Sequence, residues 1–471
     1  MRMSRPGFIG LLLFVFCDLG YTFWQHYRAP LDGDLAGIVV PSDHYQTVLE
    51  HPLGWNAIAQ DTSYAAPNRY VIHRAMHTWF RVGPRLFDTF ADPIRSVYLT
   101  SAFAKTLAHA VLLWLLAWFV TAFTPRGPRT IWLAAAILTP LFQTNGALKN
   151  TLSVVDLAPT YAFFYAWPAV LLLLYLRPWV RWWLDRPTPR WEYALGWFLA
   201  LVLPFSGPLV PGIVGVLCLL LCGRWLWLRL RHREIKLPAY AFSLLILAIG
   251  CLYSLYVGCF NTEAASPIGL WERYQRIPQG LWQLLTNKLG LSLLLITTLA
   301  QYIWIHRSDQ RIPRSARLLL RGMLWFSLLY ILLLPLGGYR DYRPLVVRRD
   351  TLLPVYMCLF WAWAYSTLFI LATSGGFSAF RQKAYAAFIG LVCLYFTLAD
   401  EPGFRQNARQ RDALYTIYRS EEAVVPVNDD CRVLHWDPIY DPPFSEIPSR
   451  ALELWGIAKP GQRFVQLTAD G

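Results

Sequence analysis

Two carboxylates flank a glycine in the segment Leu31-Asp32-Gly33-Asp34, which follows an apolar stretch near the start of the chain. A glycine relieves steric limits on the backbone, so the chain can turn sharply between the two acids. In such a pair, one carboxylate can act as a general base while the other orients it or binds a cation. A polar turn at the end of a helix is the alternative interpretation.

A second candidate group is a cluster of arginines late in the chain. The guanidinium is a planar fork that suits a phosphate, so these residues could hold an anionic head group. Two alternatives are contact with ordinary anionic lipid and pairing with Asp341 and Asp350. The arginines are Arg340, Arg343, Arg348 and Arg349.

Ionisable residues within or beside apolar segments form a third group. Lys105 and His109 are four residues apart, so they share one face of a helix. Lys149 precedes one apolar segment and Glu263 follows another. Because ionisable groups are costly in lipid, they are candidates for substrate contacts. For Lys105, extension of the side chain to the membrane surface is an equal alternative.

Two histidines, His73 and His77, also lie four residues apart, a spacing that can bind zinc. The glutamate of the H-E-x-x-H zinc motif is absent, because residue 74 is arginine. Packing and hydrogen bonding are therefore the favoured interpretation. We predict no metal or other cofactor, although a divalent cation at the acidic pair remains an option that nothing in the sequence supports.

The composition indicates an integral membrane protein. Of 471 residues, 56% are hydrophobic and 15% are charged, whereas soluble domains average about 25% charged residues. The apolar residues occur in long blocks, which argues against a soluble enzyme and against disorder. The net charge is +14, but the basic residues lie in short runs between apolar blocks, so we predict no nucleic-acid binding.

About eleven transmembrane helices are predicted, because a hydrocarbon core of about 30 Å requires about 20 apolar residues per helix. This makes residues 1–399 an all-α polytopic membrane domain. The predicted spans are 7–24, 101–123, 130–147, 157–176, 193–205, 208–222, 237–257, 289–305, 318–336, 351–373 and 384–399.

Lysine and arginine concentrate in alternate short loops, which predicts a cytoplasmic N-terminus and an extracytoplasmic C-terminus. Two large regions then lie outside. Residues 25–100 contain segments at 35–53 and 69–80 that are too polar to span but suit interfacial helices. Residues 400–471 form a small α/β tail with a predicted helix at 406–422, a strand-like segment at 433–436 and a proline-rich turn at 441–443.

This order of parts resembles the polyprenyl-phosphate-dependent integral-membrane glycosyltransferases of the GT-C superfamily. The likeness covers the layout of the whole membrane part, and its local motif is Asp32-Gly33-Asp34. The chain is also similar to uncharacterised bacterial membrane proteins with a G-D-x-A segment, then a proline and a surface helix. Here these are Gly33-Asp34-Leu35-Ala36 and Pro41. The chain departs from the GT-C pattern in lacking a second acidic motif in a long outer loop, and its tail is unassigned.

The resemblance implies a sugar donor carried on a polyprenyl phosphate and a glycan, lipid or protein acceptor at the outer face of a bacterial inner membrane. It implies Asp34, and secondly Asp32, as the general base of an inverting transfer. The leaving phosphate would be held by basic residues, and other polar residues would contact substrate. The basic candidates are Arg340, Arg343, Arg348, Lys105 and Lys149; the further contacts are His109 and Glu263.

Other classes of membrane protein remain as alternatives. An O-antigen polymerase or ligase also uses outer arginines, but its large loop usually comes late in the chain. A membrane acyltransferase would require a histidine-based site within the spans, and none is convincing. A flippase or transporter of lipid-linked sugars predicts inverted repeats and broken helices, of which Ser206-Gly207-Pro208 is one possible instance.

Overall fold

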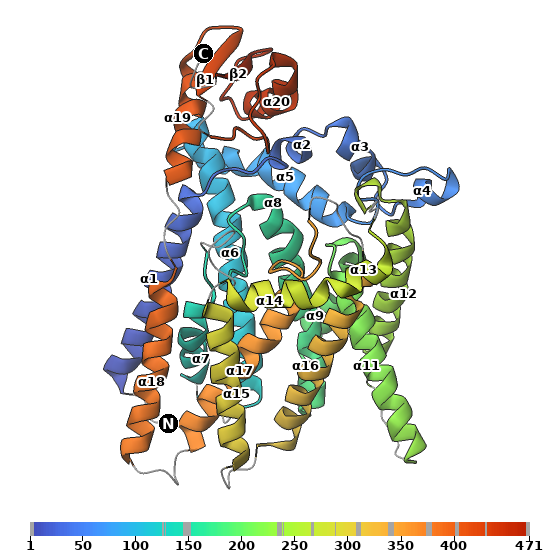
Figure 1. The fold of residues 1–471 in the computed structure, drawn as a ribbon, viewed down its shortest axis with the longest axis vertical. Coiled ribbons are helices and arrows are strands. Elements are labelled where there is room, and N and C mark those ends of the chain that lie inside the picture. Colours follow the sequence, from blue (N-terminus) through green and yellow to red (C-terminus); the bar gives the residue numbers. More distant parts are fainter. Residues whose placement is uncertain are drawn as a thin grey trace.

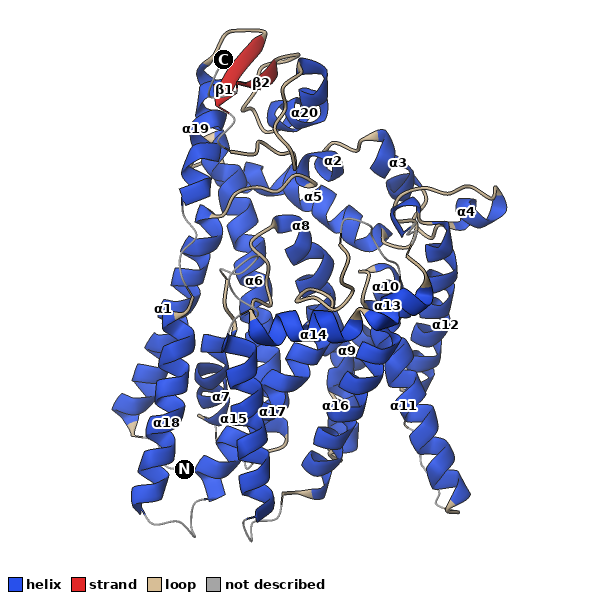
Figure 2. Cartoon of the chain, in the orientation of Figure 1, coloured by secondary structure: helices blue, strands red, loops and turns tan. Residues whose placement is uncertain are grey.

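The computed structural model is mostly helical, with a single pair of strands among the residues it describes (Figure 2). The described residues are 4–124, 127, 129–144, 152–232, 238, 240–264, 268–287, 289–307, 312–337, 343–373, 379–400, 405–428 and 431–467.

Eight helices in this described part are long and apolar enough to cross a membrane, which confirms a helical, polytopic architecture in outline. They coincide with eight of the predicted spans. They are α1 (Arg5–Arg28), α6 (Pro93–Ala122), the continuous run of α8 (Pro159–Tyr161), η2 (Ala162–Ala166) and α9 (Trp167–Trp183), α11 (Val210–Leu230), α12 (Ala241–Val257) with η4 (Gly258–Phe260), α15 (Leu289–Arg307), α16 (Arg314–Leu333) with η6 (Leu334–Leu336), and α17 (Leu353–Thr373).

The other three predicted spans also fall on helices, but these helices do not reach the same length or mean hydropathy. They are α7 (Thr130–Leu138) with η1 (Thr139–Leu141), α10 (Arg190–Val202) with η3 (Leu203–Phe205), and α18 (Ala379–Leu398). Helix α10 has only 13 residues, fewer than the roughly 20 needed to cross the hydrocarbon core perpendicularly.

Capping residues fix where two of the long helices begin. The Ser4 hydroxyl accepts from the amide of Gly7 at 3.2 Å at the start of α1, and the Asp92 carboxylate accepts from the amide of Arg95 at 2.9 Å at the start of α6. Each cap satisfies a backbone donor that the first helical turn leaves without an intrahelical partner. A proline occupies one of the first two helical positions of each, Pro6 in α1 and Pro93 in α6, where a missing amide costs nothing.

Four shorter helices of the first predicted outer region lie across one end of the bundle (Figure 1). They are α2 (Leu35–Val39), α3 (Asp43–Glu50), α4 (Trp55–Ala59) and α5 (Tyr70–Phe87). Helix α5 covers the predicted 69–80 helix from residue 70 onward, with Arg69 as its N-cap. The predicted 35–53 segment is divided into α2 and α3, because the chain leaves helical geometry at Val40 and Pro41 interrupts the backbone hydrogen bonding.

The C-terminal tail sits at the same end, above the short helices (Figure 1). It consists of α19 (Arg405–Arg419), β1 (Val424–Asn428), η8 (Pro442–Ser445), α20 (Glu446–Leu454) and β2 (Arg463–Leu467), and the two strands pair in parallel. The predicted tail helix is present as α19. The predicted strand at 433–436 is wrong: this segment bends, because Val433 and Leu434 are both buried and Leu434 takes a left-handed backbone with φ of 52°.

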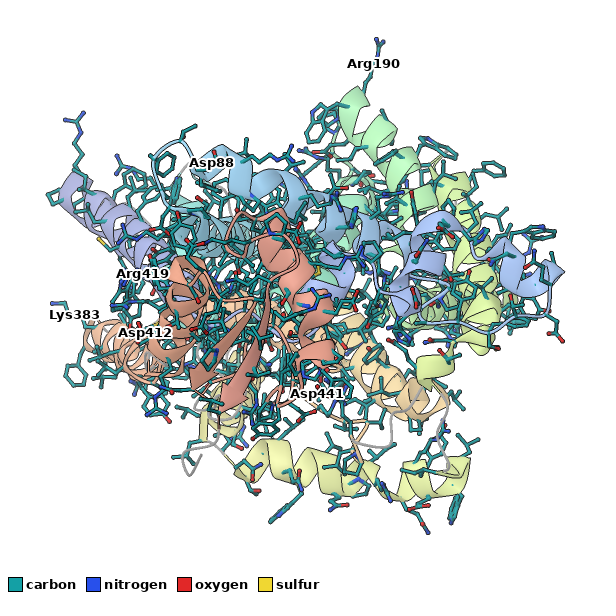
Figure 3. All side chains as sticks on the ribbon, turned by 90° about the horizontal axis from the view of Figure 1, so that it is seen from above. Asp88, Arg190, Lys383, Asp412, Arg419 and Asp441 are labelled. Carbon is teal, nitrogen blue, oxygen red and sulfur yellow. The ribbon has the colours of Figure 1, made fainter. Side chains whose placement is uncertain are left out.

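The tail and the first outer region share one hydrophobic core. Buried side chains of α19 and α20, such as Leu414 and Leu452, belong to the same cluster as Leu35 and Val39 of α2 and Phe80 of α5. Seen from above, the tail, with Asp412, Arg419 and Asp441 labelled, lies over the helices of the first region (Figure 3). The tail is therefore packed against α2 and α5 rather than built around a separate core.

Helices α13 (Leu270–Gln275) and α14 (Ile277–Thr286) run across the bundle, along one edge of the view from above (Figures 1 and 3). Trp271 and Trp282 are exposed on them, as expected for interfacial helices. Gly280 allows α14 to touch the arginine-bearing loop, since a Cβ there would lie 2.8 Å from the carbonyl oxygen of Val347. The α13–α14 pair therefore supports that loop from one side.

Candidate functional site

A cavity of about 210 Å³ is lined by segments from the first outer region, α8, η2 and the loops near residues 208, 261, 335 and 345. The lining includes apolar side chains, such as Phe164 and Leu334, as well as polar ones. Its acidic, basic and histidine lining residues are Asp34, Arg69, His73, Glu263, Arg343 and Arg348. The cavity therefore brings together residues more than 300 positions apart in the chain.

Asp34 lies directly before α2 and lines the cavity. Its Oδ1 accepts a hydrogen bond of 2.8 Å from the indole Nε1 of Trp436 in the tail. The neighbouring glycine is required for this approach. A Cβ on Gly33 would lie 2.5 Å from the backbone nitrogen of Trp436 and 2.7 Å from the carbonyl carbon of His435. The glycine thus serves close packing of two chain segments.

Asp32 has a different environment from Asp34, because it is buried and both of its oxygens accept hydrogen bonds. Oδ2 accepts from the amide of Thr160 at 2.7 Å, and Oδ1 accepts from the Thr160 hydroxyl at 2.8 Å and from the amides of Asp34 and Leu35 at 3.1 and 3.0 Å. Burial, together with the negative charge of Asp34, raises the pKa of Asp32 to about 6. Asp32 therefore ties the acidic segment to α8.

The next turn of that same helix is irregular. Residues Ala162–Ala166 form a π-helical turn, and two of its members, Phe164 and Tyr165, line the cavity. Single π-helical turns within α-helices are rare and occur frequently at functional sites, because they redirect side chains that a regular helix would place elsewhere.

Arg343 and Arg348 form the basic wall of the cavity. Arg348 binds Asp350 with two hydrogen bonds of 3.1 and 2.9 Å, and Arg343 Nη1 lies 3.6 Å from the same carboxylate. Arg343 also lies over the ring of Tyr161 at 5.1 Å. Burial and the charge of Arg348 lower the pKa of Arg343. Asp350 thus holds the two guanidinium groups on one side of the cavity.

The loop that carries these arginines is anchored by ion pairing and by backbone contacts. Arg349 pairs with Asp156 in the segment before α8 and donates to the carbonyl of Ser153 at 3.3 Å. Arg276 of the α13–α14 turn donates to the carbonyl of Pro344 at 3.0 Å. Arg349 is consequently a structural residue, whereas Arg343 and Arg348 face the cavity.

Glu263 lies on a further wall, where it accepts a hydrogen bond from the Tyr45 hydroxyl at 3.3 Å and pairs with Arg69 at 3.5 Å. Asn261 positions this wall, because its Oδ1 accepts from the amides of Ala66 and Glu263 at 2.9 and 3.1 Å. His73 lies close by, with Nδ1 2.9 Å from the carbonyl oxygen of Arg69. Burial lowers the pKa of His73 to about 4, so the imidazole is neutral at pH 7.

The structure does not bring Lys105 and His109 to this cavity. Both lie buried on α6. The Lys105 ammonium donates to the carbonyl oxygens of Leu157 and His26 at 2.7 and 3.4 Å, and the His109 ring packs 5.0 Å from that of Phe142. These contacts tie α6 to α1 and to the segment before α8. Lys149 and Arg340, the other predicted phosphate contacts, lie outside the described residues.

Several cavity residues were not singled out from the sequence, among them Tyr45, Arg69 and Thr160. Thr160 sits one residue after a proline at the start of a predicted span, a position that gives no chemical indication on its own. Trp436 was assigned only to a strand-like segment. The proximity of these residues depends on the packing of distant elements, which no local pattern encodes.

Within the described residues, no group of three or more histidine, cysteine or acidic side chains is arranged to hold a metal ion. The two histidines of α5 that lie four residues apart, His73 and His77, form hydrogen bonds instead. His73 Nδ1 lies near the Arg69 carbonyl oxygen, and His77 Nδ1 lies 3.0 Å from that of Ile38.

No family model matches this chain, and no curated protein is significantly similar to it.

Proposed function

We propose that this protein is an integral-membrane glycosyltransferase that moves a sugar from a polyprenyl-phosphate donor to a glycan, lipid or protein acceptor. The observation that supports this proposal is that Asp34, Arg343 and Arg348 line the same cavity. Such a site can activate an acceptor hydroxyl and hold an anionic carrier at the same time. The mixed apolar lining suits a donor whose carrier is a lipid.

The proposal includes a GT-C-like arrangement with eleven spans, in which α7, α10 and α18 join the eight long helices. Of these three, α7 and α10 are shorter than a perpendicular crossing requires, so they would cross together with the residues that follow them. The cavity end of the bundle faces the outside of a bacterial inner membrane, with the N-terminus in the cytoplasm. This placement rests on the distribution of lysine and arginine between alternate loops.

Asp34 is the proposed general base. Its carboxylate takes the proton of the acceptor hydroxyl, the acceptor oxygen forms a bond to the anomeric carbon, and the bond from that carbon to the phosphate oxygen breaks. The electron pair leaves with the lipid phosphate, and the anomeric configuration inverts. General-base assistance contributes about 10²–10⁴-fold to such a step.

Asp32 is less suited to this role. Both of its oxygens are already engaged by backbone amides and the Thr160 hydroxyl, and the residue is buried. A base in that position would have to give up contacts that hold the acidic segment on α8. We therefore assign Asp32 to support and Asp34 to proton transfer.

Arg343 and Arg348 are the proposed phosphate contacts. Negative charge increases on the phosphate oxygen as the bond to the sugar breaks, and preorganised donors stabilise charge that develops in the transition state. Asp350 keeps both guanidinium groups in place before the donor arrives. Glu263 and Tyr45, on the further wall, are positioned to accept and donate hydrogen bonds with sugar hydroxyls.

The test uses purified protein in lipid nanodiscs with a panel of polyprenyl-phosphate sugars and mixed cell-envelope acceptors. Release of free polyprenyl phosphate is measured for the wild type, for Asp34→Asn and for Asp43→Asn. Asp43 is an exposed carboxylate on α3 in the same outer region, so its variant is a matched control. We expect release by the wild type and the control, and a loss of about 10²–10⁴-fold in Asp34→Asn.

Other outcomes separate the alternatives. Equal release by all three proteins would remove Asp34 from the reaction. Movement of the same lipids across the bilayer of proteoliposomes, without release of the carrier from any donor, would identify a transporter instead.

A further inference from the structure

The tail is joined to the acidic segment by several specific contacts. Gln410 of α19 accepts from the amide of Leu31 at 2.8 Å and donates to its carbonyl oxygen at 3.0 Å. The Tyr98 hydroxyl on α6 donates to the same Gln410 side chain at 2.6 Å. Arg411 lies over the rings of Tyr27 and Tyr98 at 4.1 and 4.0 Å. The residue immediately before the acidic pair is therefore held by the tail.

A second contact fixes α20 on the helix that borders the site. The indole Nε1 of Trp455 donates to the carbonyl oxygen of Phe80 on α5 at 2.8 Å, and both residues are buried. Gln410 and Trp455 therefore anchor the tail at two points, the segment before α2 and helix α5. Residues 431–441, which precede η8, are therefore held near the acidic pair.

That segment is shaped so that it reaches Asp34. Leu434 adopts a left-handed backbone, a conformation that is costly for a residue with a Cβ and persists only where the surroundings require it. Arg432 Nε donates to the carbonyl oxygen of Trp436 at 3.1 Å and closes the turn. The Trp436 indole then meets the Asp34 carboxylate at 2.8 Å over the Gly33 backbone.

We propose that Trp436 of the tail is a positioning residue for Asp34, so that the tail completes the candidate active site. This inference rests on the proposed glycosyl transfer. The indole N–H engages Oδ1, which fixes the rotation of the carboxylate, and a donor to a carboxylate also stabilises its ionised form. A base must be ionised and correctly oriented to take the acceptor proton.

Other groups contribute to the charge environment of Asp34, so the effect of Trp436 has to be isolated from theirs. Arg343 interacts electrostatically with Asp34, and Asp32 precedes it by two residues. His435 adjoins Trp436 in the tail. The remaining titratable groups around the cavity are Tyr45, Arg69, His73, Tyr161, Tyr165, Glu263 and Arg348. A substitution at Trp436 leaves all of these side chains unchanged.

The experiment compares Trp436→Phe with Trp455→Phe in the full-length protein in nanodiscs. Both variants lose one indole N–H donor from the tail, but only Trp436 donates to the candidate base. For Trp436→Phe we expect kcat to fall about tenfold to a hundredfold, with KM for the donor within about twofold. We also expect the acid limb of the pH–rate profile to move up by about one pH unit.

For Trp455→Phe we expect a lower midpoint of thermal unfolding, with kcat per folded molecule and the pH–rate profile unchanged. A Trp436→Phe protein with the kcat and pH profile of the wild type would overturn the positioning role. So would equal changes of the pH profile in both variants, since these would show that general destabilisation of the tail is responsible.

A second readout does not depend on turnover. In ¹⁵N-tryptophan-labelled protein, the indole resonance missing from Trp436→Phe identifies Trp436. We expect this resonance to titrate with pH in the wild type and to lose that titration in Asp34→Asn. Titration that is the same in Asp34→Asn as in the wild type would show that Asp34 is not its partner. If the contact is confirmed but no donor supports transfer, the proposed function fails, and the positioning role fails with it although the contact stands.

Discussion

Two clusters of arginines and carboxylates, associated with the same long helix, have different surroundings. In the first, Glu192 of α10 accepts a hydrogen bond from Arg181 of α9 at 2.9 Å and forms an ion pair with Arg177 at 2.7 Å, and Glu192 is only 3% exposed. The Arg177 guanidinium is also covered by tryptophan rings at 4.7–5.5 Å. In the second cluster, Arg343 and Arg348 share Asp350 but line a cavity.

The clusters are far apart. Thr160, which lines the cavity, and Arg177 are separated by 17 residues of nearly continuous helix, or about 26 Å at 1.5 Å per residue. Residue type therefore does not distinguish the two. In the buried cluster Glu192 and Arg177 are covered by protein, so they have no access to a ligand, and only Arg181 is partly exposed. In the cavity cluster, the Asp350 carboxylate holds the guanidinium groups of Arg343 and Arg348, and both residues line the cavity. A ligand in the cavity could therefore contact them.

The largest effect is expected from a substitution that disrupts the buried cluster. Glu192→Gln leaves two guanidinium groups without their carboxylate, one of them almost fully buried, and removal of one partner of a buried ion pair costs about 3–5 kcal/mol. We expect a strongly reduced free energy of unfolding, with unchanged turnover per folded molecule. Denaturation and turnover of the same nanodisc sample measure both. Selective loss of turnover in a fully stable protein would contradict the comparison.

The next effect concerns the cavity cluster. Arg343→Gln removes a charge beside the proposed leaving phosphate, and loss of one electrostatic contact to a transition state typically costs about 10²–10³-fold in rate. We expect kcat/KM for donor turnover to fall by that factor with little change in unfolding. Arg419→Gln, at the outer end of α19 and away from the cavity, is the control. Similar kinetics of both variants would show that the cavity arginine does not contact the donor.

The third prediction concerns the pH dependence of stability, which His73 at the cavity is expected to influence. Its pKa of about 4 in the folded protein is below the ordinary value of 6.5, so the unfolded chain takes up the proton first as the pH falls. The free energy of unfolding therefore decreases as the pH falls from about 6.5 to about 4, by up to about 3 kcal/mol, because protonation favours the unfolded chain. Relative to His73→Gln, we expect the wild type to lose thermal stability across this window. The exposed His51→Gln should retain the wild-type pH dependence, and a flat difference between wild type and His73→Gln would refute the assignment.

The smallest expected effect concerns packing of the tail on the acidic segment. Gly33→Ala places a methyl group 2.5–2.8 Å from atoms of His435 and Trp436, and overpacking of this kind costs about 1–3 kcal/mol. Gly37→Ala, on α2 four residues later, meets its nearest neighbours at an ordinary 3.6 Å and serves as the control. Thermal unfolding and proteolysis of the tail measure the difference. Equal behaviour of the two variants would show that the close contact is not maintained.

The sequence was sufficient for features that depend on local patterns. Apolar blocks predicted helices at all eleven places, and the mixed polarity of residues 69–80 and 406–422 predicted α5 and α19. The charged side chains of Asp34, Glu263, Arg343 and Arg348, close to apolar segments, made these residues candidates. All four line one cavity. Whether they act as proposed is a question for the experiments above.

Contacts between distant segments could not be predicted in this way. The Trp436–Asp34 hydrogen bond joins residues 402 positions apart. The apolar sequence at 433–436 suggested a strand, but packing of the tail on Gly33 imposes a bend with a left-handed Leu434. Lys105 was a candidate for phosphate binding because it is charged. Its ammonium instead satisfies backbone carbonyl oxygens, one at the end of α1 and one before α8, which only the helix packing reveals.

The most direct test of the central claim is a cryo-electron microscopy structure of the protein in nanodiscs with a phosphonate analogue of a polyprenyl-phosphate sugar. The account predicts that the phosphonate lies within hydrogen-bonding distance of Arg343 or Arg348, with the anomeric carbon facing Asp34. Density for the head group at any other place, with this cavity empty, would contradict the account.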